Sequence, residues 1–136
     1  MARERGFTMI EVLVSMLVLA LGLLGNAGMI TNSLRQNNSA YMRSEATFLA
    51  YEIIECMRAN RAAAMLGSYN TGLGGVAASS SVAGTDLAYW KATLSSSLPA
   101  GDGAVAVDMA GNVTVTVQWD DNRDGVPVVF STQSLI

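Results

Sequence analysis

Twenty-three consecutive residues without a charge separate Glu11 from Arg35 near the beginning of the chain. As a helix, with about 1.5 Å of rise per residue, this run exceeds the hydrocarbon core of a bilayer, which is about 30 Å thick. Arg3 and Arg5 precede the run, and the positive-inside tendency keeps an end with such residues in the cytoplasm. We therefore expect residues 7–34 to cross a membrane once, with the rest of the chain outside the cytoplasm.

A secretory signal peptide is the alternative explanation of the same pattern. Signal peptides have an apolar segment of about 7–15 residues that is followed by a cleavage site of small residues. The apolar run in this chain is longer and continues into helix-forming sequence. The pattern therefore favours a retained membrane helix.

The composition of the chain excludes several kinds of partner and activity. The net charge is −3 and the basic residues are scattered, so the chain lacks the basic stripe that duplex binding requires, and we expect no direct nucleic-acid partner. Cys56 is the only cysteine, which excludes an internal disulfide, and it is expected to be a small core residue.

Catalysis has little support in the sequence. The chain contains no histidine, so Ser-His and Cys-His nucleophiles are absent. The remaining candidates are carboxylates at turns or strand ends, where solvation explains them: Asp102, Asp108, Asp120, Asp121 and Asp124. We predict that the chain is not an enzyme.

Residues 6–11, GFTMIE, stand directly before the apolar run. This segment resembles the N-terminus of type IV pilins and pseudopilins. The resemblance implies that residues 1–6 are a prepilin leader, which a prepilin peptidase removes by cutting between Gly6 and Phe7. It also implies methylation of the new amine, which gives an N-methylphenylalanine at Phe7.

Three longer stretches are similar to PilV-type minor pilins in particular: MIEVLVSMLVLALGLLG at 9–25, DLAYWKATLSSSLPAG at 86–101 and VTVTVQW at 113–119. The similarity implies a single-pass protein of the bacterial inner membrane with a periplasmic head, which is also incorporated in the extracellular pilus, or fimbrium. The implied partners are other minor pilins, the major pilin, the prepilin peptidase and the inner-membrane assembly platform.

Glu11 is a lone carboxylate at the start of the expected membrane helix, where an unpaired ion costs several kcal/mol. Cleavage before Phe7 would leave an ammonium four residues away, so the two charges can compensate each other within one helix, where the helix dipole also favours an acid. The resemblance implies instead that Glu11 meets the Phe7 amine of a neighbouring subunit, which makes it an assembly residue. A third interpretation places Glu11 at headgroup depth, solvated or protonated.

Three glycines, Gly22, Gly25 and Gly28, interrupt the apolar run. Their small-residue face allows close helix packing in a bilayer. Because glycine weakens a helix, they also allow local melting in a filament, which the resemblance implies. Both interpretations stay open.

The helix is expected to continue outside the membrane over residues 35–66, which gives a helix of about 60 residues. Apolar residues recur there with a helical period: Met42, Ala46, Leu49, Ile53 and Cys56. This stripe is expected to cover the sheet of the head, with part of it available to neighbouring subunits. Glu55 and Arg58 form an i,i+3 pair of small energetic value.

The head is expected to comprise residues 67–136. Residues 67–84 are rich in glycine and serine and are expected to be an irregular loop, either a partner-binding surface or a plain connector. A short helix is predicted over 86–98, capped by Thr85 or Asp86. Its apolar face comprises Leu87, Trp90, Leu94 and Leu98, with Trp90 as a core anchor or as an exposed binding residue.

Three strands are predicted within residues 104–132, at 104–109, 112–119 and 126–132. They form an antiparallel meander, in which alternation places Val113, Val115, Val117 and Trp119 on one apolar face that the long helix covers. Pro127 indicates that the last strand lies at an edge. The predicted fold class is therefore α+β and pilin-like, a long N-terminal helix packed against a small antiparallel head.

The turn between the last two strands, DDNRDG, matches the first half of a calcium loop through Asp120, Asn122 and Asp124. The twelfth position of that loop is Ser131, where a glutamate is needed. A polar hairpin turn is the preferred interpretation, so no cofactor is expected and calcium is a weak candidate.

The sequence thus predicts a minor pilin that helps to prime or modify type IV pilus assembly, with roles in twitching motility and adhesion implied by the resemblance. A minor pseudopilin of type II secretion is the nearest alternative. A membrane-tethered surface-binding module, which would use residues 67–84 or the DDNRDG turn, is the alternative from another class.

Overall fold

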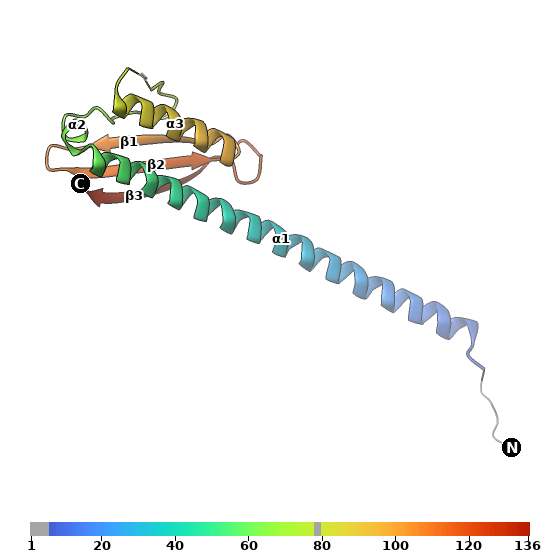
Figure 1. The fold of residues 1–136 in the computed structure, drawn as a ribbon. Helices are drawn as coiled ribbons and strands as arrows, with labels where there is room; N and C mark the ends of the chain where they lie inside the picture. The colour runs from blue at the N-terminus through green and yellow to red at the C-terminus, as the bar shows by residue number, and fades with distance from the viewer. Residues whose placement is uncertain (1–5, 78–79) are drawn as a thin grey trace. The chain divides into compact units, whose positions relative to one another are not determined.

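The computed structural model describes residues 6–77 and 80–136. Along the chain these residues form α1 (Met9–Ala59), α2 (Arg61–Met65), α3 (Val82–Ser97), β1 (Asp102–Val107), β2 (Asn112–Trp119) and β3 (Val128–Leu135). The predicted α+β, pilin-like fold, with a long N-terminal helix and a small three-stranded antiparallel sheet, is confirmed (Figure 1). The described chain divides within α1, after Asn38, into two compact units.

The first unit is the N-terminal part of α1. Its apolar side chains are exposed from Phe7, at 88%, through Leu34, at 64%. The segment is long and apolar enough to cross a membrane, and none of its most apolar stretch is buried. Nothing within this unit covers the apolar surface.

The second unit, the head, is built on the sheet, whose strand order is β1-β2-β3 with both pairings antiparallel (Figure 1). The predicted alternation of β2 is confirmed, because Val113, Val115, Val117 and Trp119 are all at most 1% exposed. Pro127 lies directly before β3, which is an edge strand as predicted.

Helices α1 and α3 supply the other half of the core. The predicted apolar face of α3 is confirmed, since Leu87, Trp90, Leu94 and Leu98 are buried. The indole N–H of Trp90 donates a 2.8 Å hydrogen bond to the Leu49 carbonyl oxygen of α1. Trp90 is therefore a core anchor, and its interpretation as an exposed binding residue is wrong.

The buried face of α1 differs from the predicted stripe at its C-terminal end. Met57 is fully buried, whereas Cys56 is only partly buried at the margin of the core. The predicted stripe repeats every seven residues, which is slightly less than two turns of a helix with 3.6 residues per turn. Its later members, such as Cys56, therefore lie progressively further from the centre of the buried face. Ala50 and Ile54 lie on this face in addition to the predicted residues.

The long helix ends earlier than the predicted residue 66. α1 stops at Ala59, Asn60 leaves the helical conformation with φ −119° and ψ 47°, and the short α2 follows. Asparagine favours helix ends because its side chain competes for local hydrogen bonds, and here the amide of Asn60 donates to the Tyr69 hydroxyl. Gly67, at φ 76°, follows α2 in the left-handed conformation that glycine tolerates.

The start of α3 corrects the predicted cap. Ser81, and not Thr85 or Asp86, is the N-cap, and its hydroxyl accepts a 3.1 Å hydrogen bond from the Gly84 N–H. The helix therefore begins four residues before the predicted 86. Asp86 accepts instead from the Tyr69 hydroxyl at 2.5 Å.

The first part of the glycine-rich segment 67–84 is hydrogen-bonded to the sheet. Tyr69 is fully buried, and Thr71 forms an antiparallel bridge with Val105. The Gly74 N–H donates to the Asp102 carboxylate at 2.5 Å. The predicted irregular loop is therefore ordered by contacts with β1 at residues 69–74, and whether it binds a partner or only connects stays a prediction. Residues 78–79 lie outside the described residues.

The strands are shifted by two or three residues from the predicted ranges 104–109 and 126–132. β1 ends at Val107 because the Asp108 carboxylate turns back to accept from the N–H groups of Ala110 and Asn112. β3 begins after Pro127, which has no N–H for the ladder, and extends to Leu135.

Candidate functional site

The N-terminal boundary of α1 contains the residues that the sequence singles out. Gly6, Phe7 and Thr8 have no regular secondary structure and are exposed, and the helix begins at Met9. The Gly6–Phe7 peptide bond thus lies in an accessible segment. The other leader residues, 1–5, lie outside the described residues, as do Arg3 and Arg5 of the orientation argument.

Glu11 and Thr8 form a reciprocal cap at this boundary. The Glu11 carboxylate accepts hydrogen bonds from the Thr8 N–H and from the Thr8 hydroxyl, both at 3.0 Å. The Thr8 hydroxyl accepts in turn from the Glu11 N–H at 3.4 Å. This is the capping box, in which an N-cap threonine and the glutamate three residues later satisfy each other's backbone donors.

The cap gives Glu11 a local role that the sequence analysis did not predict. A carboxylate held over the first turn also interacts favourably with the positive end of the helix dipole. The signal was present in the sequence, since Thr8 and Glu11 have the T-x-x-E spacing directly before an apolar run. Thr8 is therefore the functional residue that the sequence analysis missed.

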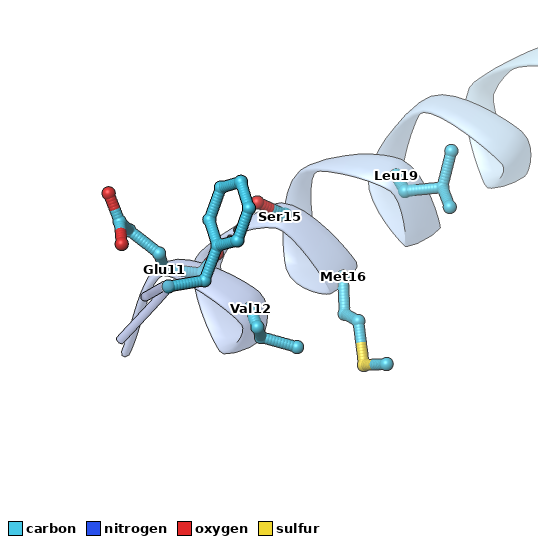
Figure 2. Close-up of a pocket in the computed structure, with 6 residues that line it drawn as sticks. Glu11, Val12, Ser15, Met16 and Leu19 are labelled. Carbon is cyan, nitrogen blue, oxygen red and sulfur yellow. Dashed lines mark hydrogen bonds between the residues drawn. The ribbon is translucent and has the colours of Figure 1, made fainter. Parts of the chain in front are cut away.

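A shallow, open hollow of about 350 Å³ lies over this first part of the helix, and its lining includes both Phe7 and Glu11. Figure 2 shows the Glu11 carboxylate directed past the start of the helix, while Met16 and Leu19 project from the turns that follow. The Ser15 hydroxyl is used internally, since it donates to the Glu11 carbonyl oxygen at 2.6 Å. The structure therefore places Phe7 and Glu11 beside the same hollow at the start of α1.

The three glycines of the membrane segment lie within regular helix. Gly22, Gly25 and Gly28 have open space beside the helix, because a Cβ added at any of the three would meet nothing within 4 Å beyond its chain neighbours and the nearby helix backbone. The space for close approach of another helix is therefore present. Both interpretations of these glycines concern assembled subunits and stay predictions.

The candidate calcium residues are used in a hairpin turn. The two Asp120 oxygens accept from the N–H groups of Asp124 and Gly125, at 3.2 and 2.9 Å, and Asp124 accepts from the Val126 N–H. Within residues 6–77 and 80–136, no group of three or more potential ligand residues is placed to hold a metal ion. The hydrogen bonds of Asp120 and Asp124 match a polar turn, which was the preferred interpretation of Asp120, Asn122 and Asp124.

The first 25 residues match the family model of the prokaryotic N-terminal methylation motif. Comparison with curated proteins and with solved structures found no match. The match makes the N-terminal segment similar to that of type IV pilin-like proteins. Together with the apolar helix, it is consistent with anchoring in a membrane.

Proposed function

We propose that this chain is a minor pilin of the type IV pilus, which is held in the inner membrane by the first part of α1 and helps to prime or modify pilus assembly. The observation that carries the proposal is the methylation motif at residues 1–25, placed directly at the start of an uncovered apolar helix. In the proposed maturation, a prepilin peptidase cuts between Gly6 and Phe7 and methylates the Phe7 amine.

The capping box provides the Glu11 carboxylate with hydrogen-bond donors both before and after the proposed cleavage. An ionised carboxylate has about four acceptor positions, so Glu11 can keep the two hydrogen bonds from Thr8 and still bind an ammonium. Before cleavage, the Thr8 donors stabilise the acid. After cleavage, the Phe7 amine supplies the opposite charge that an apolar setting requires.

The proposed assembly step uses the amine of a neighbouring subunit. Thr8 already satisfies Glu11 within its own chain, and both side chains are exposed on the first turn. An incoming subunit that places Glu11 against the Phe7 amine of its neighbour neutralises two charges in lipid. Each unpaired charge would cost several kcal/mol, so this pairing fixes the axial position of the subunit.

The experiment is complementation of a deletion strain with Glu11→Ala, and with Ser15→Ala as the matched control one helical turn later. We expect filaments sheared from the cell surface to contain the wild-type chain and the Ser15→Ala variant, and to lack Glu11→Ala. Normal incorporation of Glu11→Ala would contradict the assembly role of this residue.

The phenotype of the deletion strain distinguishes a subunit of a pilus from a subunit of a secretion system. Loss of surface pili and twitching motility, together with co-purification of pilus subunits, would support the proposal. Loss of exoprotein release with normal pili would assign the chain to the minor pseudopilins of type II secretion, which have the same kind of leader and helix by resemblance.

A further inference from the structure

A pocket of about 210 Å³ opens in the head between the C-terminal part of α1 and α3. Its lining includes an apolar floor and two carboxylates: Ile53, Cys56, Trp90, Tyr89, Glu52 and Asp86. Pockets for small molecules usually have volumes of about 300–1,000 Å³. This smaller pocket suits a single side chain.

The two carboxylates reach the pocket from different helices and are held without a cationic partner. The ion pairs of the described residues join Arg58 to Glu55 and Lys91 to Asp102, so neither Glu52 nor Asp86 takes part in one. Asp86 is fixed by the Tyr69 hydroxyl, which donates to it at 2.5 Å. The pocket thus presents uncompensated negative charge beside apolar walls.

Cys56, on the same wall, is sensitive to this charge. The pKa of its thiol is raised from the ordinary value of 9.0, first by burial and then by the nearby negative charges of Asp86 and Glu52. A thiolate is disfavoured where the local potential is negative. The same potential favours a cation in the pocket.

Aromatic rings border the pocket and extend the surface along α1. Trp90 forms part of the floor, and Tyr89 is 66% exposed at the rim. An adjoining open hollow on α1 is lined by Phe48 and Tyr51, together with Glu52, and both rings are more than half exposed. Aromatic faces attract guanidinium and ammonium groups, and exposed aromatic residues are enriched at protein interfaces.

The net charge of the head indicates whether the cation comes from a second copy of this chain or from a different protein. Residues 39–136 contain five Lys or Arg and nine Asp or Glu, a formal net charge of −4. A second copy would bring the same negative head, which disfavours close approach, whereas a different chain with a basic surface is complementary.

We propose that this pocket receives the arginine or lysine side chain of a different protein that docks across α1 and α3. The proposal goes beyond the pilin function, because it identifies the chemistry of a partner that binds the head. It does not depend on cleavage before Phe7.

The first test uses the full-length chain in detergent and measures alkylation of Cys56, its only cysteine, by iodoacetamide. The probes are N-acetylarginine amide and its neutral isostere N-acetylcitrulline amide, and each rate is divided by the rate without probe. A bound guanidinium covers the thiol, which slows alkylation, but it also favours the reactive thiolate, so the rates are compared at their high-pH plateau, where the thiol is fully ionised. There we expect the arginine probe alone to slow alkylation. Glu52→Gln should weaken this protection roughly two- to fivefold, because a partly exposed ion pair changes a binding constant by about that factor.

Glu45→Gln is the matched control, because Glu45 lies two helical turns earlier on α1 and outside the pocket lining. We expect this variant to keep the protection. Equal protection by both probes, or protection by neither, would overturn the proposal, and so would equal loss in the two variants.

The second test measures Cys56 labelling in the native cells. We expect slower labelling in cells than in the purified chain, with Glu52→Gln but not Glu45→Gln losing this difference. Equal labelling of both variants would overturn the proposal, and a dimer of the purified chain that dissociates on Glu52→Gln would overturn the assignment to a different protein. Cys56 labelling does not depend on whether the chain is cleaved before Phe7. A negative result in these two tests would therefore refute the docking proposal without bearing on the proposed pilin function.

Discussion

One oxygen of the Glu11 carboxylate accepts two hydrogen bonds from Thr8, one from its backbone N–H and one from its hydroxyl, each at 3.0 Å. The acid that looks costly at the start of an apolar helix is therefore also one half of the cap that stabilises the first turn of α1. This double use explains why a carboxylate can stand at that position before any partner subunit is present.

Thr8→Ala should loosen the start of α1. Loss of an N-cap hydroxyl costs about 0.5–2 kcal/mol. In Thr8→Ala the Glu11 N–H keeps the Thr8 carbonyl oxygen at 3.1 Å but loses the hydroxyl as its second acceptor, and the Glu11 carboxylate loses one of its two donors. We expect hydrogen exchange at the Glu11 amide, measured by NMR in micelles, to accelerate by about fivefold, which corresponds to a typical cap loss of about 1 kcal/mol. Thr8→Ser keeps the hydroxyl and should exchange like the wild type, and equal exchange in Thr8→Ala would contradict the cap.

The two tryptophans of the head allow a matched comparison. Trp90 donates to the Leu49 carbonyl oxygen at 2.8 Å, whereas the indole nitrogen of the equally buried Trp119 has no partner among the described residues. We expect Trp90→Phe to lower the free energy of unfolding by about 1 kcal/mol more than Trp119→Phe, the value of one hydrogen bond. Chemical denaturation of the full chain in detergent measures both, and a larger loss for Trp119→Phe would be inconsistent with this anchor.

Gly103 on β1 leaves room for the helix packed above it. A Cβ at this position would clash with the Trp90 ring and with Leu94. We expect Gly103→Ala to destabilise the head by about 1–3 kcal/mol through overpacking. Gly72→Ala, where a Cβ meets open space, is the control and should change stability little; equal thermal midpoints for the two variants would argue against close packing of α3 on β1.

Asp102 should make the head sensitive to acid. Burial raises the pKa of its carboxyl, but hydrogen bonds from the Gly74 and Gly103 N–H groups and the contacts with Lys91 outweigh burial and bring the pKa below its ordinary value of 3.8. Because the folded state binds this proton less readily than the unfolded state, the stabilisation is complete above the unfolded pKa and is lost as the pH falls through the folded pKa.

Asp102→Asn should therefore lower the free energy of unfolding by about 1 kcal/mol at neutral pH, and the difference from wild type should shrink as the pH falls below 3.8. Denaturant titrations across this range measure the difference, with Glu45→Gln as the control. A difference that stays constant down to the lowest pH would exclude Asp102 as a source of the pH dependence.

Local patterns in the sequence predicted much of the fold. The alternation of Val113, Val115 and Val117 identified the buried face of β2, and the spacing of Leu87 and Leu94 identified that of α3. These predictions held because each depends on the period of a single element. The cap by Ser81 was missed because Thr85 and Asp86 are equally acceptable capping residues, and only the path of the chain selects among them.

Contacts between distant segments could not be predicted in the same way. The bridge between Thr71 and Val105 and the hydrogen bond between Gly74 and Asp102 join residues about thirty positions apart. A glycine-rich sequence has no period that would indicate such contacts. The pocket between Glu52 and Asp86 likewise exists only after α3 packs on α1. At the start of α1, by contrast, the capping box depends only on the local T-x-x-E spacing of Thr8 and Glu11, which the sequence itself contains.

The most direct measurement is the mass of the N-terminal peptide of the protein purified from its native cells. We expect a chain that begins at Phe7 and carries one methyl group on its amine. A fully active protein that retains Met1 and the next five residues would contradict this expectation.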